Sequence, residues 1–432
     1  NSMLERALRT YKAIAYRIGQ AEVTINLGEL QLLRGFLERA LKTYEETIQL
    51  AHSLSNDLIE SNALLGLGIV HSKKGELVRA GNYLYEAQKR IEAQLTDAVY
   101  SIMEAEILVR KARLAVLAGQ FDEATTSLTT AHSYTSQHAL TSPIEASILL
   151  TEGQLFLTQG DFTQAESRFS TAYSQAELLQ EPLLAAEALL GLAQTRLSRK
   201  ELDAASASFL EAGRQFQLLE SVEGDAEALL GVAQTLIGRG QWNEAIEHCE
   251  GAGTRFHQSG NLIGEADTTF TFGLAYRGNG DLQEAARNFE QAVNLYQQYH
   301  LPLQEADARY ERAGLLLLDD QFDLAMNDLA RAIKLVEQVM NTLGSADQWS
   351  IFLRQYTELY AQTAITQLRR NQENEAHSTL SSFVRITGRD PIMEYLVAYE
   401  NSILTSTDEM NENEAQSNTR LVKRLRTLRK SL

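Results

Sequence analysis

Cysteine and proline are nearly missing from this sequence. The 432 residues include one cysteine, Cys249, and four prolines. A single cysteine excludes an internal disulfide and is typical of a reducing compartment, so we expect a cytoplasmic protein. The scarcity of proline, together with abundant alanine, leucine, glutamate and glutamine, favours a mostly helical chain.

An excess of positive charge and long apolar runs are missing as well. The formal net charge is −18. Surfaces that bind nucleic acids are basic, so this charge argues against nucleic-acid binding by most of the chain. No apolar run approaches the roughly 18 residues that span a bilayer, and the first residues lack the apolar segment of a signal peptide. The sequence therefore predicts a protein without a membrane span.

The sequence contains instead one short pattern that returns many times. The stretch "GDFTQAESRF", which begins at Gly160, is followed by "GQWNEAIEHC" from Gly240 and "GDLQEAARNF" from Gly280. Such self-similarity at a nearly fixed period is the signature of a repeat architecture. The alanine five places after the start of each repeat occupies the positions Ala7, Ala40, Ala80, Ala124, Ala165, Ala205, Ala245, Ala285, Ala325 and Ala376.

Three other positions repeat together with this alanine. In one unit, Ala285 is followed by the large Phe289 and the small Ala292, and the small Gly273 precedes it by twelve places. The first three lie on one face of an α-helix, where small residues let a second helix approach closely. Gly280, between the two helices, is suited to the left-handed conformation that ends the first one. Each unit is therefore predicted to be a helix hairpin that is completed by stacking on its neighbours.

These positions resemble those of the tetratricopeptide repeat (TPR). That repeat usually has 34 residues, whereas most successive repeat alanines in this sequence are 40 residues apart. The resemblance implies an all-α fold, a right-handed α-solenoid of stacked helix hairpins, or TPR superhelix. We expect a partial leading repeat at 1–19, with its second helix only, and a solenoid of about nine hairpins at 20–385. A terminal helix at 386–405, an acidic polar linker at 406–418 and a basic amphipathic helix at 419–432 should follow. Because the leading repeat lacks its first helix, we expect the chain to be part of a longer protein.

The last repeat is the longest, because its first helix is predicted to be extended. Trp349, Phe352, Tyr356 and Tyr360 follow a helical stripe along it. This ending is similar to the arrays that precede the caspase-like peptidase domain of bacterial TPR–CHAT proteins. The resemblance implies a CHAT-associated bacterial protein whose catalytic residues belong to a domain beyond this chain.

No pattern for catalysis, for a metal or for a cofactor is visible in the sequence. Cys249 stands at a large packing position, which predicts a core residue, and its neighbour His248 points about 100° away from it on a helix. Neither an HExxH motif, nor paired Cys/His spacing, nor a phosphate-binding loop occurs. We therefore predict no enzyme activity, no catalytic residues, no metal and no cofactor.

A solenoid offers a concave face formed by its first helices. The resemblance to TPRs places on that face the residues 18, 15, 11 and 8 positions before each repeat alanine. The residues at positions 18 and 11 include many acids and three successive glutamines. They suit an extended partner segment that is basic or presents its backbone, although acids in a first helical turn are also favoured by the helix dipole alone. The predicted partner-binding residues are Gln154, Glu187, Gln194, Glu227, Gln234, Asp267 and Asp307.

The sequence thus favours a scaffold or a regulatory sensor module that binds a partner protein or peptide and is part of a larger bacterial protein. Regulation of an attached caspase-like peptidase is one version of that role. The alternative is the sensor region of a MalT-type transcriptional regulator that responds to a small molecule. The basic helix at 419–432 is expected to cap the acidic solenoid or to link it to another domain. A membrane-surface or nucleic-acid role is the alternative for that helix.

Overall fold

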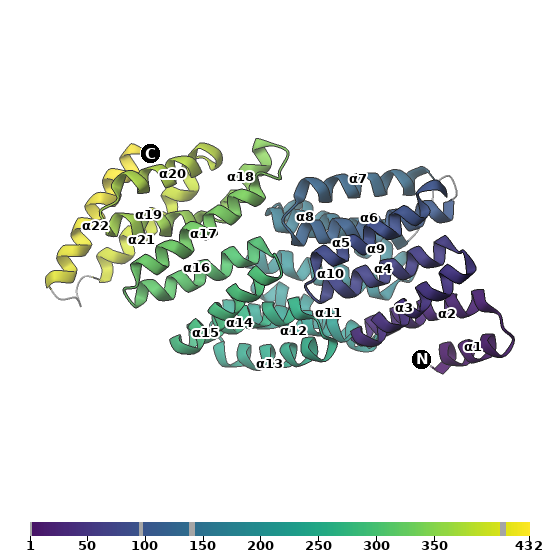
Figure 1. The fold of residues 1–432 in the computed structure, drawn as a ribbon. Helices are drawn as coiled ribbons and strands as arrows, with labels where there is room; N and C mark the ends of the chain where they lie inside the picture. The colour runs from purple at the N-terminus through teal and green to yellow at the C-terminus, as the bar shows by residue number, and fades with distance from the viewer. Residues whose placement is uncertain (1, 95–97, 138–142, 407–411) are drawn as a thin grey trace. The chain divides into compact units, whose positions relative to one another are not determined.

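The computed structural model describes residues 2–94, 98–137, 143–406 and 412–432, and all regular structure within them is helical (Figure 1). The helices α1 to α22 are accompanied by one short 3-10 helix, Glu92–Gln94. This confirms the predicted all-α fold of stacked hairpins. No helix among the described residues is both long enough and apolar enough to cross a bilayer.

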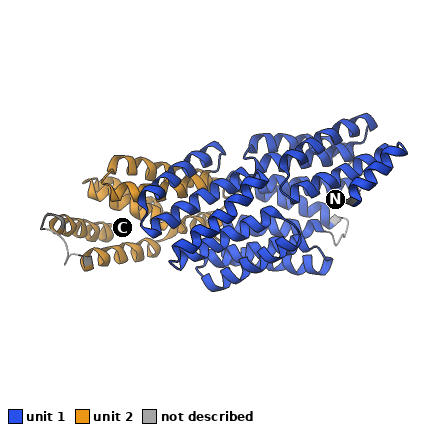
Figure 2. Cartoon of the chain, turned by 90° about the horizontal axis from the view of Figure 1, so that it is seen from below, with its two compact units in different colours: residues 1–158, 162–301 blue, residues 159–161, 302–432 orange. Residues whose placement is uncertain are grey.

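The helices form two compact units (Figure 2). The first unit comprises residues 1–158 and 162–301, and the second comprises 159–161 and 302–432. The helices of the first unit are α1 (Ser2–Ala13), α2 (Arg17–Leu33), α3 (Leu37–Leu54), α4 (Asp57–Lys73), α5 (Leu77–Ile91), α6 (Ala98–Leu117), α7 (Phe121–Gln137), α8 (Pro143–Gln159), α9 (Phe162–Leu179), α10 (Pro182–Ser198), α11 (Leu202–Leu218), α12 (Val222–Gly238), α13 (Trp242–Ser259), α14 (Leu262–Asn279) and α15 (Leu282–Gln298). From α2 onward, each even-numbered helix and the helix after it form one hairpin.

The second unit continues the same pattern and then departs from it. The pair α16 and α17 is a hairpin, whereas the repeat that ends with α20 has two helices before its turn. The helices of this unit are α16 (Pro302–Leu318), α17 (Phe322–Met340), α18 (Ala346–Arg354), α19 (Thr357–Arg369), α20 (Glu373–Thr387), α21 (Asp390–Ser406) and α22 (Glu412–Ser431).

The repeated small and large residues form the core. One buried cluster contains Ala193, Ala205, Phe209 and Ala212, and each of these four residues is at most 1% exposed. The next hairpin also contacts this site, because a methyl group added at Gly231 would lie 2.2 Å from the Phe209 ring. The predicted helix crossings are therefore the packing contacts of the stack.

The turn between the helices of a hairpin is left-handed, as the sequence predicts. The φ angles are 80° at Gly160 and 89° at Gly280. Lys200 takes the same conformation without being glycine, with a φ of 63°. The hydrogen bond from Glu201 N to Arg196 O, 2.9 Å long, closes this turn and satisfies a carbonyl at the end of α10.

The prediction of one extended helix before α20 is wrong. The chain forms α18 and α19, with Gln355 and Tyr356 between them. Tyr356 N bonds to Leu353 O at 2.9 Å, and Thr357 Oγ1 bonds to Arg354 O at 2.8 Å. These short-range bonds replace the helical i→i−4 pattern and turn the chain, so the aromatic stripe is not one continuous helical face.

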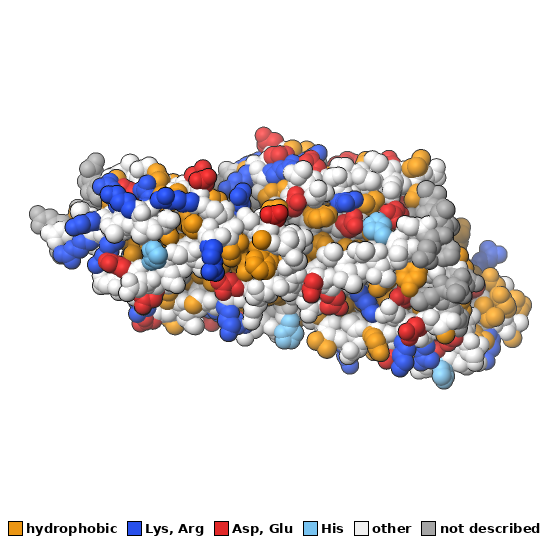
Figure 3. Space-filling view, turned by 90° about the horizontal axis from the view of Figure 1, so that it is seen from above, with side chains coloured by type: hydrophobic (Ala, Val, Ile, Leu, Met, Phe, Trp, Pro, Cys, Tyr) orange, Lys and Arg blue, Asp and Glu red, His pale blue; other side chains and the backbone are white. Residues whose placement is uncertain are grey.

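The basic C-terminal helix is longer than predicted and packs within the second unit. Residues 407–411 of the expected linker lie outside the described residues, and α22 already begins at Glu412. Leu425 is fully buried, and Arg426 Nε lies 2.7 Å from Glu400 Oε1 on α21. Arg429 pairs with the same carboxylate. Figure 3 shows Lys and Arg side chains gathered at the end that holds α20 and α22, so part of this charge is used in contacts within the unit.

Replacing an alanine at a helix crossing should destabilise the fold. In Ala205→Leu and Ala285→Leu, the added carbons have no space, because both alanines are 0% exposed. We expect each substitution to lower the free energy of unfolding by about 1–3 kcal/mol in urea titrations. Ala207→Leu, at an exposed position of the same helix α11, should change it by less than about 0.5 kcal/mol. Equal losses at positions 205 and 207 would contradict the assigned packing.

Candidate functional site: the inner face of the first unit

A polar face runs along the first helices of the hairpins in the first unit. The positions 18 and 11 places before each repeat alanine lie seven residues apart, so both fall on one side of the helix. Glu187 and Gln194 illustrate this on α10, where both are half-buried while Ala186 and Leu190 belong to the core. We call this surface the inner face; it includes Glu106, Arg113, Gln154, Glu187, Gln194, Glu227, Gln234 and Asp267.

Arg113 connects three hairpins across the inner face. It lies on α6, and its Nε donates a hydrogen bond to Thr151 Oγ1 on α8 at 3.1 Å. Its Nη2 lies 3.6 Å from Glu187 Oε2 on α10. One arginine therefore spans from the third hairpin to the fifth, which requires strong curvature of the inner face. Glu187, predicted as a binding residue, is already partly neutralised by this arginine.

The acids of the next two hairpins are less well compensated. Burial raises the pKa of Glu227 on α12, and the neighbouring Glu223 and Glu187 raise it further, while Lys73 from α4 opposes the rise. Burial also raises the pKa of Asp267 on α14 to about 6, although the Tyr296 hydroxyl donates a 2.8 Å hydrogen bond to its Oδ1. The inner face thus carries carboxyl groups whose charged form is disfavoured.

The side chains of the three predicted glutamines have no hydrogen-bond partner among the described residues. Gln154 is exposed, and Gln194 and Gln234 are half-buried. Each amide can donate to one group and accept from another, so the three offer polar contacts on consecutive first helices.

Asp307, the seventh predicted residue, lies on α16 in the second unit. Its side chain is exposed, yet the surrounding protein raises its pKa to about 7, and it contributes to the raised pKa of Tyr356. A side chain can reach solvent and still be flanked by protein on several sides, which accounts for both observations. Asp307 is therefore not part of the inner face of the first unit.

Sequence reasoning missed the basic residues that accompany the acids. Arg113 occupies the same repeat position as Gln154, Gln194 and Gln234, so comparison of that position one unit earlier would have found it. Arg110 lies on the same helix, and its buried Nε has no hydrogen-bond partner among the described residues. The inner face is thus mixed in charge rather than purely acidic and neutral.

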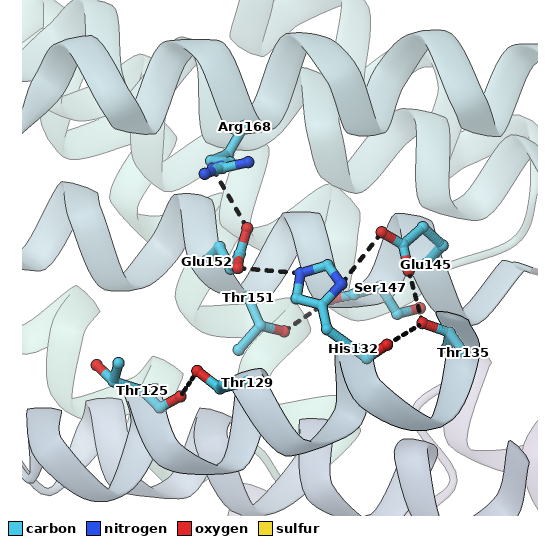
Figure 4. A network of polar contacts seen from close by, with 9 residues as sticks. All are labelled: Thr125, Thr129, His132, Thr135, Glu145, Ser147, Thr151, Glu152 and Arg168. Atoms are coloured by element: carbon cyan, nitrogen blue, oxygen red, sulfur yellow. Dashed lines mark hydrogen bonds and ion pairs between the residues drawn. The ribbon is translucent and has the colours of Figure 1, made fainter. Parts of the chain in front are cut away.

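A second polar cluster lies outside the inner face and joins α7 to α8 and α9 (Figure 4). His132 Nδ1 lies 3.3 Å from Glu145 Oε1, and its Nε2 lies 3.1 Å from Glu152 Oε1. Arg168 Nε lies 3.2 Å from the other oxygen of Glu152. The hydrogen bonds to Glu145 and then to Glu152 raise the pKa of His132 to about 9. The cluster is an ionic brace, and no group suited to hold a metal ion occurs in the part of the chain that the structure describes.

Comparison with protein families identifies the repeats. Residues 224–298 match one family model of the tetratricopeptide repeat, and residues 150–217 and 270–338 match another. The hairpins in these ranges are tetratricopeptide repeats, which confirms the resemblance for that part of the chain. No curated protein sequence matches the chain.

Solved structures share the fold at low sequence identity. A Rap protein complexed with Competence and Sporulation Factor has a TM-score of 0.55 and 17% identity, over 86% of this chain and 98% of that protein. The Rap conjugation gene regulator of plasmid pLS20, in complex with the Phr* peptide, has a TM-score of 0.56 and 15% identity, over 75% of this chain and 98% of that protein. At such identities the likeness shows the fold alone.

The His132 brace should make stability depend on pH. The pKa of His132 is raised to about 9 in the folded state, against about 6.5 when unfolded, so its contribution is complete below pH 6.5 and is lost as pH rises through 9. We expect His132→Gln to cost about 1–2 kcal/mol in chemical denaturation at pH 6 and much less at pH 9.5. His52→Gln, at an exposed histidine, is the control. A loss for His132→Gln that is the same at both pH values would contradict the ionic role.

Proposed function

We propose that this chain is a protein-interaction or regulatory module, and that the inner face of its first unit binds an extended segment of a partner protein or peptide. The observation that carries the proposal is the placement of unengaged glutamine amides and disfavoured carboxyl charges on consecutive first helices. The two Rap structures support it by analogy, because they are complexes with Competence and Sporulation Factor and with the Phr* peptide.

The spacing of the hairpins suits a peptide backbone. Packed helices lie about 8–10 Å apart, and an extended chain advances about 3.3 Å per residue. The amides of Gln154, Gln194 and Gln234 would therefore meet roughly every third residue of a segment that lies along them. An amide that both donates and accepts matches the N–H and C=O of such a backbone.

The carboxyl groups supply selectivity for charge. Because Arg113 already faces Glu187, the less compensated acids are Glu227 and Asp267. A basic side chain placed beside them would favour their ionised form, so binding would release protons. Affinity for a basic segment should accordingly increase as Asp267 ionises, between about pH 5 and pH 7.

The larger context of the chain stays a prediction. Attachment to a CHAT-type peptidase and the MalT-type sensor role both concern domains beyond the residues described. Neither is needed for the inner face to bind a segment, so binding can be tested on this chain alone.

Peptides selected from a random twelve-residue display library would test the inner face. Gln194→Ala with Gln234→Ala should weaken binding of a selected peptide about 5- to 50-fold, from the loss of two neutral hydrogen bonds, with little change in salt dependence. Asp267→Asn should weaken binding of basic peptides and flatten its dependence on pH and salt, while it keeps the oxygen that accepts from Tyr296. Calorimetric titration measures both effects.

The matched controls are Gln297→Ala and Glu290→Gln, at exposed positions of the second helix α15. They change the same chemical groups outside the inner face and should leave affinity unchanged. If the controls abolish binding while the inner-face variants do not, the partner uses the other surface and the proposal is wrong.

A further inference from the structure

Hairpins far apart in the sequence touch each other within the first unit. Arg34, after α2, forms an ion pair with Glu220, in the turn before α12. Lys73, at the end of α4, pairs with Glu223, in the first turn of α12 and 150 residues away. We call this contact the seam. It brings the first two hairpins back to the turns that join the fifth, sixth and seventh.

Two glycines let the backbones approach at the seam. A methyl group added at Gly35 would lie 2.8 Å from Ser259 Cβ, and one added at Gly75 would lie 2.5 Å from the Tyr299 ring. Both glycines have positive φ, at 74° and 71°, so they end their helices and also permit this approach. The same residues thus serve the local turn and the distant contact.

The seam differs in chemistry from the contacts between neighbouring hairpins. It encloses an open cavity of about 480 Å³, whose lining includes Arg34, Phe36, Glu220 and Asp225. Neighbouring hairpins instead bury dry columns of alanine and aromatic residues. The Arg34 and Glu220 side chains are 27% and 65% exposed, and those of Lys73 and Glu223 are 25% and 16% exposed. Salt screens ion pairs to the extent that they reach solvent. The ion pairs of the seam therefore make its strength depend on salt.

The seam adjoins the inner face. Glu223 lies one helical turn before Glu227 on α12, so both point to the same side. Asn261 Nδ2 donates a 2.7 Å hydrogen bond to Glu223 Oε1, which ties the start of α14 to the same carboxylate. Lys73 thus lies at the border of the inner face. If Lys73 separated from Glu223, the end of α4 and the start of α12 would no longer be held together.

We propose that the pairs Arg34–Glu220 and Lys73–Glu223 form a reversible ionic clasp that controls entry to the inner face. Closure holds the first helices of the second and sixth hairpins together, and opening separates them without unfolding either hairpin. The clasp itself is independent of any ligand; only its role in admitting a partner rests on the function proposed above.

Spin labels on the full chain can measure the clasp. Glu45→Cys on α3 and Glu247→Cys on α13 place labels at exposed positions on the two sides of the seam. The natural Cys249 stays unlabelled because it is 0% exposed and burial raises the pKa of its thiol to about 12. Raising the ionic strength from 0.1 to 1 M shortens the screening length from about 10 to about 3 Å and should shift the distance distribution to longer values.

Charge reversal should open the clasp, and a second reversal should close it. Arg34→Glu with Lys73→Glu should lengthen the distance at low salt, and the further changes Glu220→Arg and Glu223→Arg should shorten it again. Arg79→Glu with Arg214→Glu is the matched control, because these arginines pair with acids only three residues away. Labels at Glu45→Cys and Glu86→Cys lie on the first two hairpins, which form the same side of the seam. The distance between these two labels should stay the same in every variant.

Three results would overturn the clasp: an unchanged distance in the first variant with native helix content, no recovery after the second reversal, or equal opening in the control. If a charge-reversal variant fails to fold, a salt titration of the chain that carries only the Glu45→Cys and Glu247→Cys labels decides the matter. A distance that is constant from 0.1 to 1 M salt would then reject the proposal.

Access to the inner face needs a separate readout. A thiol at Gln194→Cys should react several-fold faster with a bulky maleimide in the Arg34→Glu, Lys73→Glu variant than with the clasp intact. If the labels show opening but this rate does not change, the seam does not control entry. Neither measurement uses a partner, so failure of the clasp and failure of peptide binding are distinguishable.

Discussion

The close crossing of two helices at an alanine is the constraint on which this structure depends. Each crossing places an alanine such as Ala205 against a neighbouring helix, with Phe209 filling the space beside it. Because these few positions supply the packing, the side chains on the other side of each first helix are not needed for the core. That side can therefore carry charges and amides without disrupting the hairpin, which is how the stack acquires a polar inner face.

Curvature then converts separate side chains into a site. On an isolated helix, Glu187 and Glu227 would be ordinary exposed acids near a helix start. In the stack, Arg113 reaches across two hairpins to Glu187, and the surrounding protein disfavours the charge on Glu227. The packing of alanines and aromatic rings offsets this unfavourable electrostatic arrangement. A partner that supplies positive charge would stabilise the charged form of Glu227. The unfavourable electrostatic free energy is therefore located on the surface where binding is proposed.

The sequence predicts what depends on local periodicity, and it misses what depends on curvature. The packing positions, the left-handed turns and the placement of Gln194 and Asp267 on first helices all follow from spacing along the chain. The break at Gln355 does not, because the aromatic stripe continues through it with helical spacing. The pairing of Lys73 with Glu223 is beyond such reasoning, since it arises only after several hairpins have added their small rotations.

The distribution of contact types indicates where the first unit can move. Neighbouring hairpins are joined by buried columns that interdigitate, so sliding one past the other would expose apolar surface and leave cavities. The seam combines the close approach of Gly35 and Gly75 to Ser259 and Tyr299 with two ion pairs beside an open cavity, and the ion pairs can be exchanged for contacts with water and salt. The seam therefore responds to salt and to charge reversal in a way that the apolar columns of the stack do not. Since Glu223 of the seam and Glu227 of the inner face stand one helical turn apart on α12, a change at the seam would be felt at the candidate binding surface.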